Sequence, residues 1–355
     1  MTKATQTAVV GVTGYAGAEL ARLLLRHPHL KGKPPVFAGR VEGKDLAHGG
    51  VPLTEIHPQL AGSYGVDDLK MEPFSWELLE EHGTDVLFLA TPHEQSRQWV
   101  PEALKRGFRV IDLSAAWRLT EAANRAVYAF EDDSTKLAAA TQAKAVYGMP
   151  ELYRKQIAGA KLVANPGCYA TSIILPLKPL VVAGLVDLKH GIIADAKSGV
   201  SGAGKAPTAR THFMYAADNL SAYSVFAHRH TGELLEQIGI ARDEIVFTPH
   251  LLPIPRGILS TIYVHFKKAQ TRDGVAGVYR EFFAGSPLVR LYEKSLPQIQ
   301  HSVRTNYADI GFELDSGGKR AVIVSCIDNL LKGAAGQAVQ NLNVMMGWPE
   351  SEGLA

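Results

Sequence analysis

The chain has 355 residues, a length that exceeds one ordinary domain and suggests two. Hydrophobic residues make up 46% and charged residues 20%, which argues against a disordered chain. With 37 basic and 35 acidic residues, the net charge of +2 provides no extended field to attract nucleic acid or an anionic membrane.

Two further features of the composition bear on location. The most apolar stretch, residues 162–186, contains three prolines, Asn165 and Lys178, so it is too interrupted to cross a membrane. Two cysteines, Cys168 and Cys326, cannot build a disulfide framework or a Cys-rich zinc site. We therefore expect a cytoplasmic protein in a reducing compartment, with no leader at its start.

The first half of the chain alternates between strand and helix patterns. Short apolar runs predict strands over residues 8–12, 36–38, 85–90 and 109–113. Leucines at helical spacing predict a helix over residues 19–26. Strands that are apolar on both faces and separated by helices are typical of a parallel sheet.

The second half has longer, partly alternating runs, which predict a mixed or antiparallel sheet with strands over residues 191–194, 244–247 and 259–266. The chain ends on a predicted helix over residues 333–346. The fold class is therefore α/β, with a Rossmann-type parallel sheet domain and an α+β domain with a mixed sheet. We place the first domain at residues 1–160 and the second at 161–328, and expect a C-terminal helix of about 329–350 to pack back on the first.

A glycine-rich turn follows the first predicted strand. Glycines at 11, 14 and 17 let the backbone turn sharply and approach a pyrophosphate, which the N-terminus of the next helix then binds. The alternative is a tight turn with no ligand. The residues of this turn predicted to bind the cofactor are Gly11, Thr13, Gly14, Tyr15, Ala16 and Gly17.

The end of the second strand distinguishes between the two nicotinamide cofactors. An acidic residue there would bind the ribose hydroxyls of NAD, whereas this chain has Gly39 and Arg40. A guanidinium suits a 2′-phosphate, so Arg40 favours NADP. The alternative is a solvated arginine in a loop.

Cys168 follows a Pro-Gly break and precedes an apolar run, which places it near the start of a helix. The helix dipole favours a thiolate there and so makes Cys168 a candidate nucleophile. A buried structural cysteine is the alternative, and it is the reading we adopt for Cys326 inside a strand. The His-Arg-His segment at 228–230 could supply the base that a thiolate nucleophile needs. Metal binding by its two histidines lacks a third ligand, and we predict no metal site.

Taken together, these segments resemble the N-acetyl-gamma-glutamyl-phosphate reductase family, within the wider aspartate-semialdehyde dehydrogenase group. The resemblance covers nearly the whole chain, and the order of its motifs is more specific than any one of them. The matching segments are residues 11–20, 110–114, 147–151, 165–171, 198–204, 228–231, 253–257 and 328–337.

The resemblance implies an enzyme of arginine biosynthesis that uses NADPH to reduce N-acetyl-gamma-glutamyl phosphate to N-acetylglutamate semialdehyde and phosphate. Cys168 matches the nucleophile that forms a thioester, and His230 matches the acid/base, with His228 as the fallback. The family also implies an NADP-binding first domain and a catalytic second domain that assembles a homodimer or homotetramer.

Other site residues are carried over from the family by position. Arg118 matches a phosphate-binding arginine, and Asn165 is assigned to the substrate. Arg256 is a candidate for a substrate carboxylate, with a structural ion pair as the alternative. Ser114, Ser198, Gly199 and Asn329 are assigned to the cofactor, although the glycines of segment 198–204 could serve only as turn residues.

The sequence departs from the family pattern at three points. Gly232 stands where proline often follows His-Thr, Ala116 and Trp117 replace an Asp-Phe pair, and Gly39 replaces a frequent serine. Three other functions stay open at this point: reduction of aspartyl phosphate or carrier-bound aminoadipyl phosphate, a non-catalytic NADP-binding regulator, and a cysteine hydrolase or acyltransferase.

Overall fold

The computed structural model describes residues 5–63, 65–132 and 134–354. The chain forms two compact units, each described below by itself. The first comprises Met1–Arg118, Glu131–Asn165 and Ala335–Ala355, and the second comprises Leu119–Phe130 and Pro166–Ala334. The division thus falls after Asn165 rather than after residue 160. Segment Leu119–Phe130 groups with the second unit because Glu236 of that unit accepts hydrogen bonds from Thr120 and Asn124.

The first unit is built on an eight-stranded sheet in the order β3-β4-β2-β1-β5-β6-β8-β7. Every neighbouring pair is parallel except β3 with β4. The predicted parallel sheet is confirmed, and the central β1 and β5 are buried at every residue. The strands are β1 (Thr7–Val10), β2 (Val36–Gly39), β3 (Val51–Pro52), β4 (Lys70–Pro73), β5 (Val86–Leu89), β6 (Arg109–Asp112), β7 (Ala145–Tyr147) and β8 (Leu162–Ala164).

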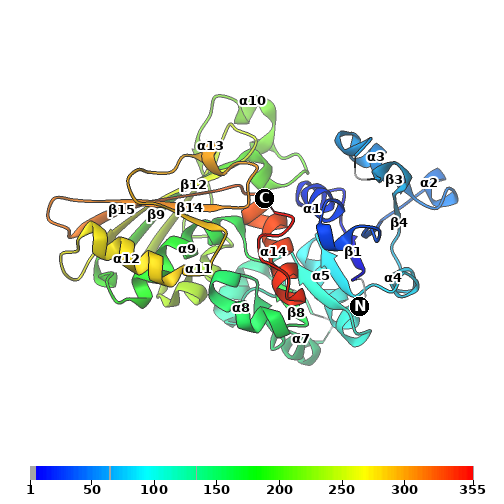
Figure 1. The fold of residues 1–355 in the computed structure, drawn as a ribbon, viewed down its shortest axis with the longest axis horizontal. Coiled ribbons are helices and arrows are strands. Elements are labelled where there is room, and N and C mark those ends of the chain that lie inside the picture. The colour runs from blue at the N-terminus through cyan, green and yellow to red at the C-terminus, as the bar shows by residue number, and fades with distance from the viewer. Residues whose placement is uncertain (1–4, 64, 133, 355) are drawn as a thin grey trace. The chain divides into compact units, whose positions relative to one another are not determined.

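The helices of the first unit include one from the C-terminal end of the chain. They are α1 (Tyr15–Leu25), α2 (Lys44–Ala47), α3 (Leu53–Ile56), α4 (Trp76–Glu81), α5 (His93–Lys105), α7 (Thr135–Gln142), α8 (Pro150–Gly159) and α14 (Gly336–Met346). Helix α14 packs against α8 and α1 (Figure 1). Gln337 and Asn341 of α14 each donate a 2.9 Å hydrogen bond to the carbonyl oxygen of Gly148.

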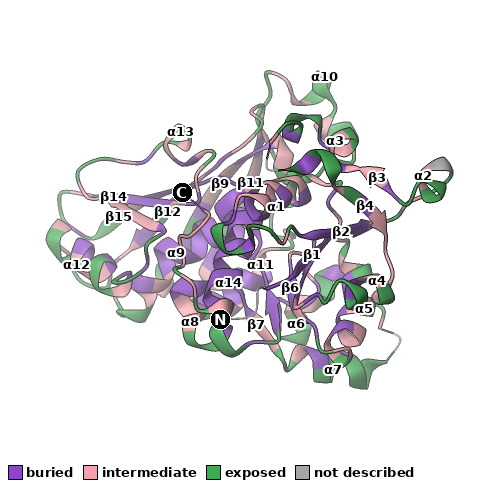
Figure 2. Ribbon diagram, turned by 45° about the vertical axis from the view of Figure 1, so that its right-hand side comes forward, coloured by how far each residue is buried: buried purple, intermediate pink, exposed green. Residues whose placement is uncertain are grey.

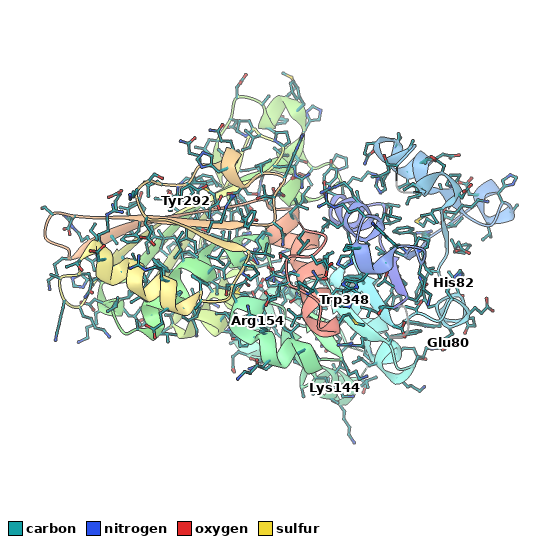
Figure 3. All side chains as sticks on the ribbon, viewed as in Figure 1. Glu80, His82, Lys144, Arg154, Tyr292 and Trp348 are labelled. Atoms are coloured by element: carbon teal, nitrogen blue, oxygen red, sulfur yellow. The ribbon has the colours of Figure 1, made fainter. Side chains whose placement is uncertain are left out.

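The residues after α14 stay attached to the first unit. Trp348 stacks on His29 at 4.3 Å between ring centroids, and Glu350 forms an ion pair with Arg154. Figure 3 labels Arg154 on α8 and Trp348 just beyond the end of α14. Among the described residues, no helix combines the length and apolar character needed to span a membrane.

The second unit contains a seven-stranded mixed sheet in the order β10-β11-β9-β12-β15-β14-β13. Pairs β9–β11 and β13–β14 are parallel and the other four pairs are antiparallel, which confirms the mixed sheet. The strands are β9 (Ile192–Gly199), β10 (Ser221–Ala222), β11 (Ile245–Leu252), β12 (Ile258–His265), β13 (Val289–Tyr292), β14 (Ala308–Leu314) and β15 (Arg320–Ile327).

Helix α9 packs against β12 and β15 on one face of this sheet and is buried along most of its length (Figures 1 and 2). The alternate residues of the strands point to the other face, where Ile193, Val246 and Tyr263 lie side by side in register and are 50%, 36% and 43% exposed. The helices of this unit are α6 (Ala122–Arg125), α9 (Cys168–Val182), α10 (Phe213–Ala216), α11 (Thr231–Leu234), α12 (Arg272–Phe282) and α13 (Ile299–Ser302).

Candidate active site

Cys168 is the first residue of helix α9, and Gly167 is the N-cap. The apolar run after the Pro-Gly break forms the buried helix that the sequence predicts, so the thiol lies at the positive end of a 15-residue helix dipole. Gly333 packs closely against Cys168, since a Cβ on Gly333 would lie 2.8 Å from Cys168 Cβ. The thiol is partly exposed and Cys326 is buried, and neither cysteine is in a disulfide.

Gly167 is in direct contact with two side chains from the segment around α11. A Cβ on Gly167 would lie 2.5 Å from His230 Nε2 and 2.7 Å from Glu233 Oε1. The Gly167 N–H donates a 2.9 Å hydrogen bond to Glu233 Oε2. The residue before the nucleophile, the imidazole and a fully buried carboxylate thus share one small volume.

Cys168 and His230 both line a cavity of about 710 Å³ within the second unit. Ser198 at the end of β9, Leu251 on β11 and the segments 208–211 and 223–230 complete most of its wall. This volume suits a small-molecule substrate. Among the described residues, those that line the cavity include no aspartate or glutamate, whereas Arg210 and Arg229 both line it.

The environment of His228 differs from that of His230. Burial, together with the positive charges of His230 and Arg229, lowers the pKa of His228 from 6.5 to about 2. His228 Nδ1 accepts a 3.1 Å hydrogen bond from the His230 backbone N–H. A ring that stays neutral across the working pH range is a poor proton donor. The lowered pKa of His228 therefore favours His230 as the acid/base.

Two tyrosines connect the cavity wall to the sheet. Tyr169 Oη donates to the carbonyl oxygen of His250 at 2.7 Å, and Tyr223 Oη donates to Tyr169 Oη at 3.4 Å. Burial raises the pKa of both phenols, so both remain protonated donors. His228 packs edge-to-face against both rings, at 5.4 and 5.6 Å between centroids.

In the first unit, the glycine-rich turn has the close approaches that a dinucleotide cradle needs. Gly11 has φ +93°, and a Cβ there would collide with Ala90 O, while a Cβ on Gly17 would collide with Gly11 O. Gly14 is the N-cap of α1 and supplies no side-chain cap, so the first N–H groups of α1 are left for another acceptor. Thr13 and Gly14 line a cavity of about 530 Å³, whereas Tyr15 and Ala16 begin the helix.

Arg40 lines the same cavity from the end of β2. Its side chain is 89% exposed and lies 2.5 Å from Glu42, an exposed ion pair that a ligand phosphate can displace. Gly39 is explained by packing, since a Cβ there would lie 2.7 Å from Met71 Sδ. The turn and Arg40 line one cavity, which fits a nicotinamide dinucleotide.

Three other predicted site residues form a hydrogen-bonded group in the first unit. Ser114 Oγ donates to the buried Asp112 carboxylate at 2.8 Å. Burial raises the pKa of Asp112, and the hydrogen bonds from Ser114 oppose this shift only in part. Arg118 is buried, and its guanidinium donates to the carbonyl oxygens of Asn165 and Leu113 at 2.7 and 2.8 Å. Asn165 Oδ1 accepts from Asn341 at 3.0 Å.

The predicted nicotinamide-side residues hold two loops of the second unit together. The side chain of Asn329 accepts a 2.7 Å hydrogen bond from the Gly257 N–H and donates to Ser201 Oγ at 2.9 Å. Gly199 must lack a side chain, because a Cβ there would lie 2.7 Å from the Arg256 backbone N. Ser198 lines the cavity that contains Cys168.

Arg256 is engaged with a buried carboxylate. Its Nε and Nη2 both lie 3.1 Å from the oxygens of Asp328, which is fully buried and also accepts from the Leu330 N–H. This is the structural ion pair that the sequence left open as the alternative. Arg256 is also absent from the residues that line the Cys168 cavity.

Sequence reasoning missed Glu233, Arg210, Tyr223 and Gly333. Glu233 and Tyr223 lie near the His-Arg-His segment in the sequence, and Gly333 lies in a Gly-Ala-Ala-Gly run. These were the only features of the sequence that could have pointed to them. Arg210 follows an unremarkable Pro-Thr-Ala stretch, and only the tertiary structure brings it to the cavity.

Two of the residues that depart from the family pattern, Gly232 and Trp117, are in close contact with neighbouring side chains. A Cβ on Gly232 would lie 3.0 Å from Leu119 and Asn124, which leaves little room there. Trp117 is buried in the core of the first unit and stacks under the Arg97 guanidinium at 4.2 Å. Within residues 5–63, 65–132 and 134–354, no group of three His, Cys, Asp or Glu side chains could hold a metal ion.

Two family models together match most of the chain. The semialdehyde dehydrogenase NAD-binding domain matches residues 6–160, and the semialdehyde dehydrogenase dimerisation domain matches residues 168–329. The first match contains all the residues that line the glycine-turn cavity, and the second contains all those that line the Cys168 cavity.

Solved structures share the fold at low sequence identity. Aspartate semialdehyde dehydrogenase II of Vibrio cholerae, complexed with ASA, has a TM-score of 0.69 at 17% identity, and the match covers 98% of this chain and 99% of that one. Aspartate semialdehyde dehydrogenase of Candida albicans, solved with NADP, also has a TM-score of 0.69, at 16% identity and with the same coverage.

Curated relatives are much more similar in sequence. The N-acetyl-gamma-glutamyl-phosphate reductase of Methanococcus maripaludis is 41% identical over 351 residues, covering 98% of this chain and 97% of the relative. That of Desulfotalea psychrophila is 43% identical over 356 residues, with the same coverage. On this full-length similarity, the chain belongs to the N-acetyl-gamma-glutamyl-phosphate reductase family of the semialdehyde dehydrogenases.

Proposed function

We propose that this chain reduces N-acetyl-gamma-glutamyl phosphate with NADPH to N-acetylglutamate 5-semialdehyde and phosphate, in arginine biosynthesis. The observation that carries the proposal is Cys168 at the N-terminus of α9, beside His230, in a cavity whose described wall residues include arginines and no carboxylates. Such a wall suits an anionic acyl phosphate.

Cys168 acts as the nucleophile in this proposal. Its thiolate attacks the acyl carbonyl carbon, the C–S bond forms, and the C–O bond to phosphate breaks with its electrons leaving on the phosphate. Hydride addition to the thioester carbonyl then lets the C–S bond break and releases the aldehyde. Sulfur suits both steps, because it is a good nucleophile and a good leaving group.

His230 moves the proton in both steps. It accepts the thiol proton before attack, and as an imidazolium it stabilises the developing oxyanion and protonates the leaving group or the carbonyl oxygen. The buried Glu233 carboxylate beside it favours the charged ring. His228, which remains neutral, keeps the backbone of His230 in place through its Nδ1.

The first unit would bind the cofactor, which supplies the hydride when bound. The N–H groups at the start of α1 and the turn that the glycines at 11, 14 and 17 allow would hold the pyrophosphate, and Arg40 would hold the 2′-phosphate. Ser198, Gly199 and Asn329 are assigned to the nicotinamide half, with Asn329 acting through the loop it ties to Gly257. Ser114 is assigned to the same ligand.

Substrate phosphate is assigned to Arg118 and Asn165, although hydrogen bonds within the first unit already use part of both side chains. Arg256 is the weaker candidate for the substrate carboxylate, because the Asp328 carboxylate already neutralises its charge.

We assign assembly to the second unit, as a homodimer or homotetramer. The exposed apolar row of Ile193, Val246 and Tyr263 lies on its open sheet face, and the matching family model is described as a dimerisation domain. Light scattering of the wild type and of Ile193→Glu would test this. A cytoplasmic location fits two cysteines that are not joined in a disulfide.

The decisive experiment runs the reaction in reverse. N-acetylglutamate 5-semialdehyde, phosphate and NADP⁺ are mixed with the protein, and NADPH absorbance is followed, with NAD⁺ in parallel. A phosphate-dependent rise with NADP⁺ supports the proposal. If no rise is seen, and aspartate semialdehyde or a carrier-bound aminoadipate semialdehyde is active instead, that aldehyde is the product of the forward reaction and the proposed substrate is wrong.

A further inference from the structure

The cavity that contains Cys168 has two guanidinium groups in its wall, and the phosphate is assigned to neither of them. Arg210, Arg229, His228 and His230 line it, and its described wall residues include no aspartate or glutamate. Burial leaves His228 neutral, so the guanidiniums are the fixed charges. A substrate that carries a second anionic group besides its acyl phosphate would match such a wall.

Arg210 is the guanidinium available to that second group. It lies on the one-turn helix Ala209–Thr211, and its Cζ is 4.9 Å from the centre of the Tyr223 ring. Within the described part of the chain, Arg210 forms no ion pair, in contrast to Arg256 with Asp328. A guanidinium over an aromatic ring is attracted to the face of that ring, and its planar fork of N–H donors matches the geometry of a carboxylate.

Arg210 is held in place on two sides. Thr208 and Thr211 bond reciprocally, with Thr208 N–H to Thr211 Oγ1 at 2.9 Å and Thr211 N–H to Thr208 Oγ1 at 3.3 Å, which fixes the backbone around it. The Tyr223 ring below the guanidinium is itself fixed by its hydrogen bond to Tyr169 and by edge-to-face packing on His228. This preorganisation lowers the entropy cost of binding.

Arg229 faces a different neighbour. Its guanidinium lies 5.8 Å from the centre of the Tyr128 ring, and Tyr128 Oη donates to its carbonyl oxygen at 3.3 Å. Its side chain is thus directed toward segment Leu119–Phe130, whereas Arg210 lies over Tyr223, a ring that itself lines the cavity.

We propose that Arg210, positioned by the Tyr223 ring, binds the free carboxylate of the substrate and makes that carboxylate a requirement for turnover. The inference rests on the proposed function, in which the substrate carries a carboxylate distant from its reacting carbonyl. In this proposal Arg210, a residue of the cavity wall, recognises the substrate carboxylate in place of Arg256, the residue expected from sequence.

The test compares two aldehydes with the full-length protein in the phosphate-dependent reverse reaction. One is N-acetylglutamate 5-semialdehyde, and the other carries a primary carboxamide in place of the carboxylate. The wild type should prefer the carboxylate in kcat/KM by about 10- to 100-fold, the value of a charge-assisted bidentate contact. Arg210→Gln should lose that preference by slowing only the carboxylate substrate, and Arg210→Lys should keep part of it.

Matched variants separate this role from general damage to the cavity. Tyr223→Phe keeps the ring but loses its hydrogen bond to Tyr169, so it should keep most of the preference, whereas Tyr223→Leu should lose more of it. Arg229→Gln and Arg256→Gln should keep the wild-type ratio. An unchanged ratio in Arg210→Gln, or loss of the ratio in Arg256→Gln or Arg229→Gln instead, overturns the inference. If the wild type turns over neither aldehyde, the proposed function falls as well, so the two failures are distinguishable.

Discussion

The Gly167 N–H donates a 2.9 Å hydrogen bond to the buried carboxylate of Glu233, a residue 66 positions further along the chain. Gly167 immediately precedes Cys168, and His230 Nε2 lies against the same glycine. Glu233 and His230 thus both lie against the turn that positions Cys168. Tyr169 and His228 also pack against His230, at 6.2 and 4.8 Å between ring centroids.

We expect Glu233→Gln to alter the pH dependence of the reaction. Glutamine keeps an oxygen for the Gly167 N–H but removes the negative charge that favours a protonated His230 and, through it, a Cys168 thiolate. The kcat should fall by about 10- to 100-fold. The pH midpoint for alkylation of Cys168 by iodoacetamide should rise.

Glu236→Gln is the control, because Glu236 lies one turn further along and bonds to segment 119–124 instead. That variant should keep the wild-type midpoint. A Glu233→Gln enzyme with an unchanged midpoint would show that the carboxylate only supports the fold.

Gly167→Ala should impair catalysis by displacing His230. The added Cβ would lie 2.5 Å from His230 Nε2 and 2.7 Å from Glu233 Oε1, so both must move. A displacement of this size costs about 100-fold in kcat, and overpacking costs about 1–3 kcal/mol of stability. Gly159→Ala, where a Cβ meets nothing within 4 Å, should match the wild type in steady-state kinetics and urea denaturation. Normal turnover by Gly167→Ala would contradict this geometry.

Cys168→Ser should lose at least about 1,000-fold in turnover, because a hydroxyl is a poor nucleophile and alkoxide a poor leaving group. Its thermal unfolding should remain near that of the wild type. Cys326→Ala is the matched control, since burial raises the pKa of Cys326 to about 12 and keeps that thiol unreactive. Iodoacetamide should label Cys168 alone, and substantial activity in Cys168→Ser would exclude the thioester route.

His228 should make the protein less stable in mild acid. Its pKa falls from 6.5 to about 2 on folding, so below pH 6.5 the unfolded chain binds a proton that the folded chain does not. The free energy of unfolding should therefore decrease as the pH falls from 7.5 to 5.5, by about 1 kcal/mol from this residue. Burial lowers the pKa of His27 as well, which adds to the same trend.

Urea denaturation of the wild type and of His228→Gln at both pH values measures this contribution. The variant should show a smaller loss between pH 7.5 and 5.5. An equal loss in both proteins would mean that His228 does not stay neutral in the folded state.

Arg40→Ser should reduce selectivity for NADP. Removing a charge-assisted contact with the 2′-phosphate should raise the KM for NADP by about 10- to 100-fold and leave the KM for NAD nearly unchanged. Arg22→Ala, an arginine of α1 paired with Glu19, serves as the control. Equal changes in both KM values would show that Arg40 stabilises the turn and does not select between the two cofactors.

Much of the fold could be predicted from sequence, because local patterns determine it. Buried strands such as β1 and β5 are apolar on both faces, and the glycine turn at 11–17 can adopt few other conformations. The start of α9 at Cys168 was likewise predictable from the Pro-Gly break. The position of Arg256 was predictable, but its partner was not, because Asp328 is 72 residues away in the chain.

The sequence by itself determined the two kinds of sheet and the family, and it predicted Cys168 as the nucleophile, since strand periodicity, turn chemistry and motif order are local properties. Only the tertiary structure decided which side chains share a volume. It placed Glu233 against Gly167, put Arg210 on Tyr223 in the cavity wall, and neutralised Arg256 with Asp328. These contacts join residues far apart in the chain, and their electrostatics depend on burial, which no local pattern specifies.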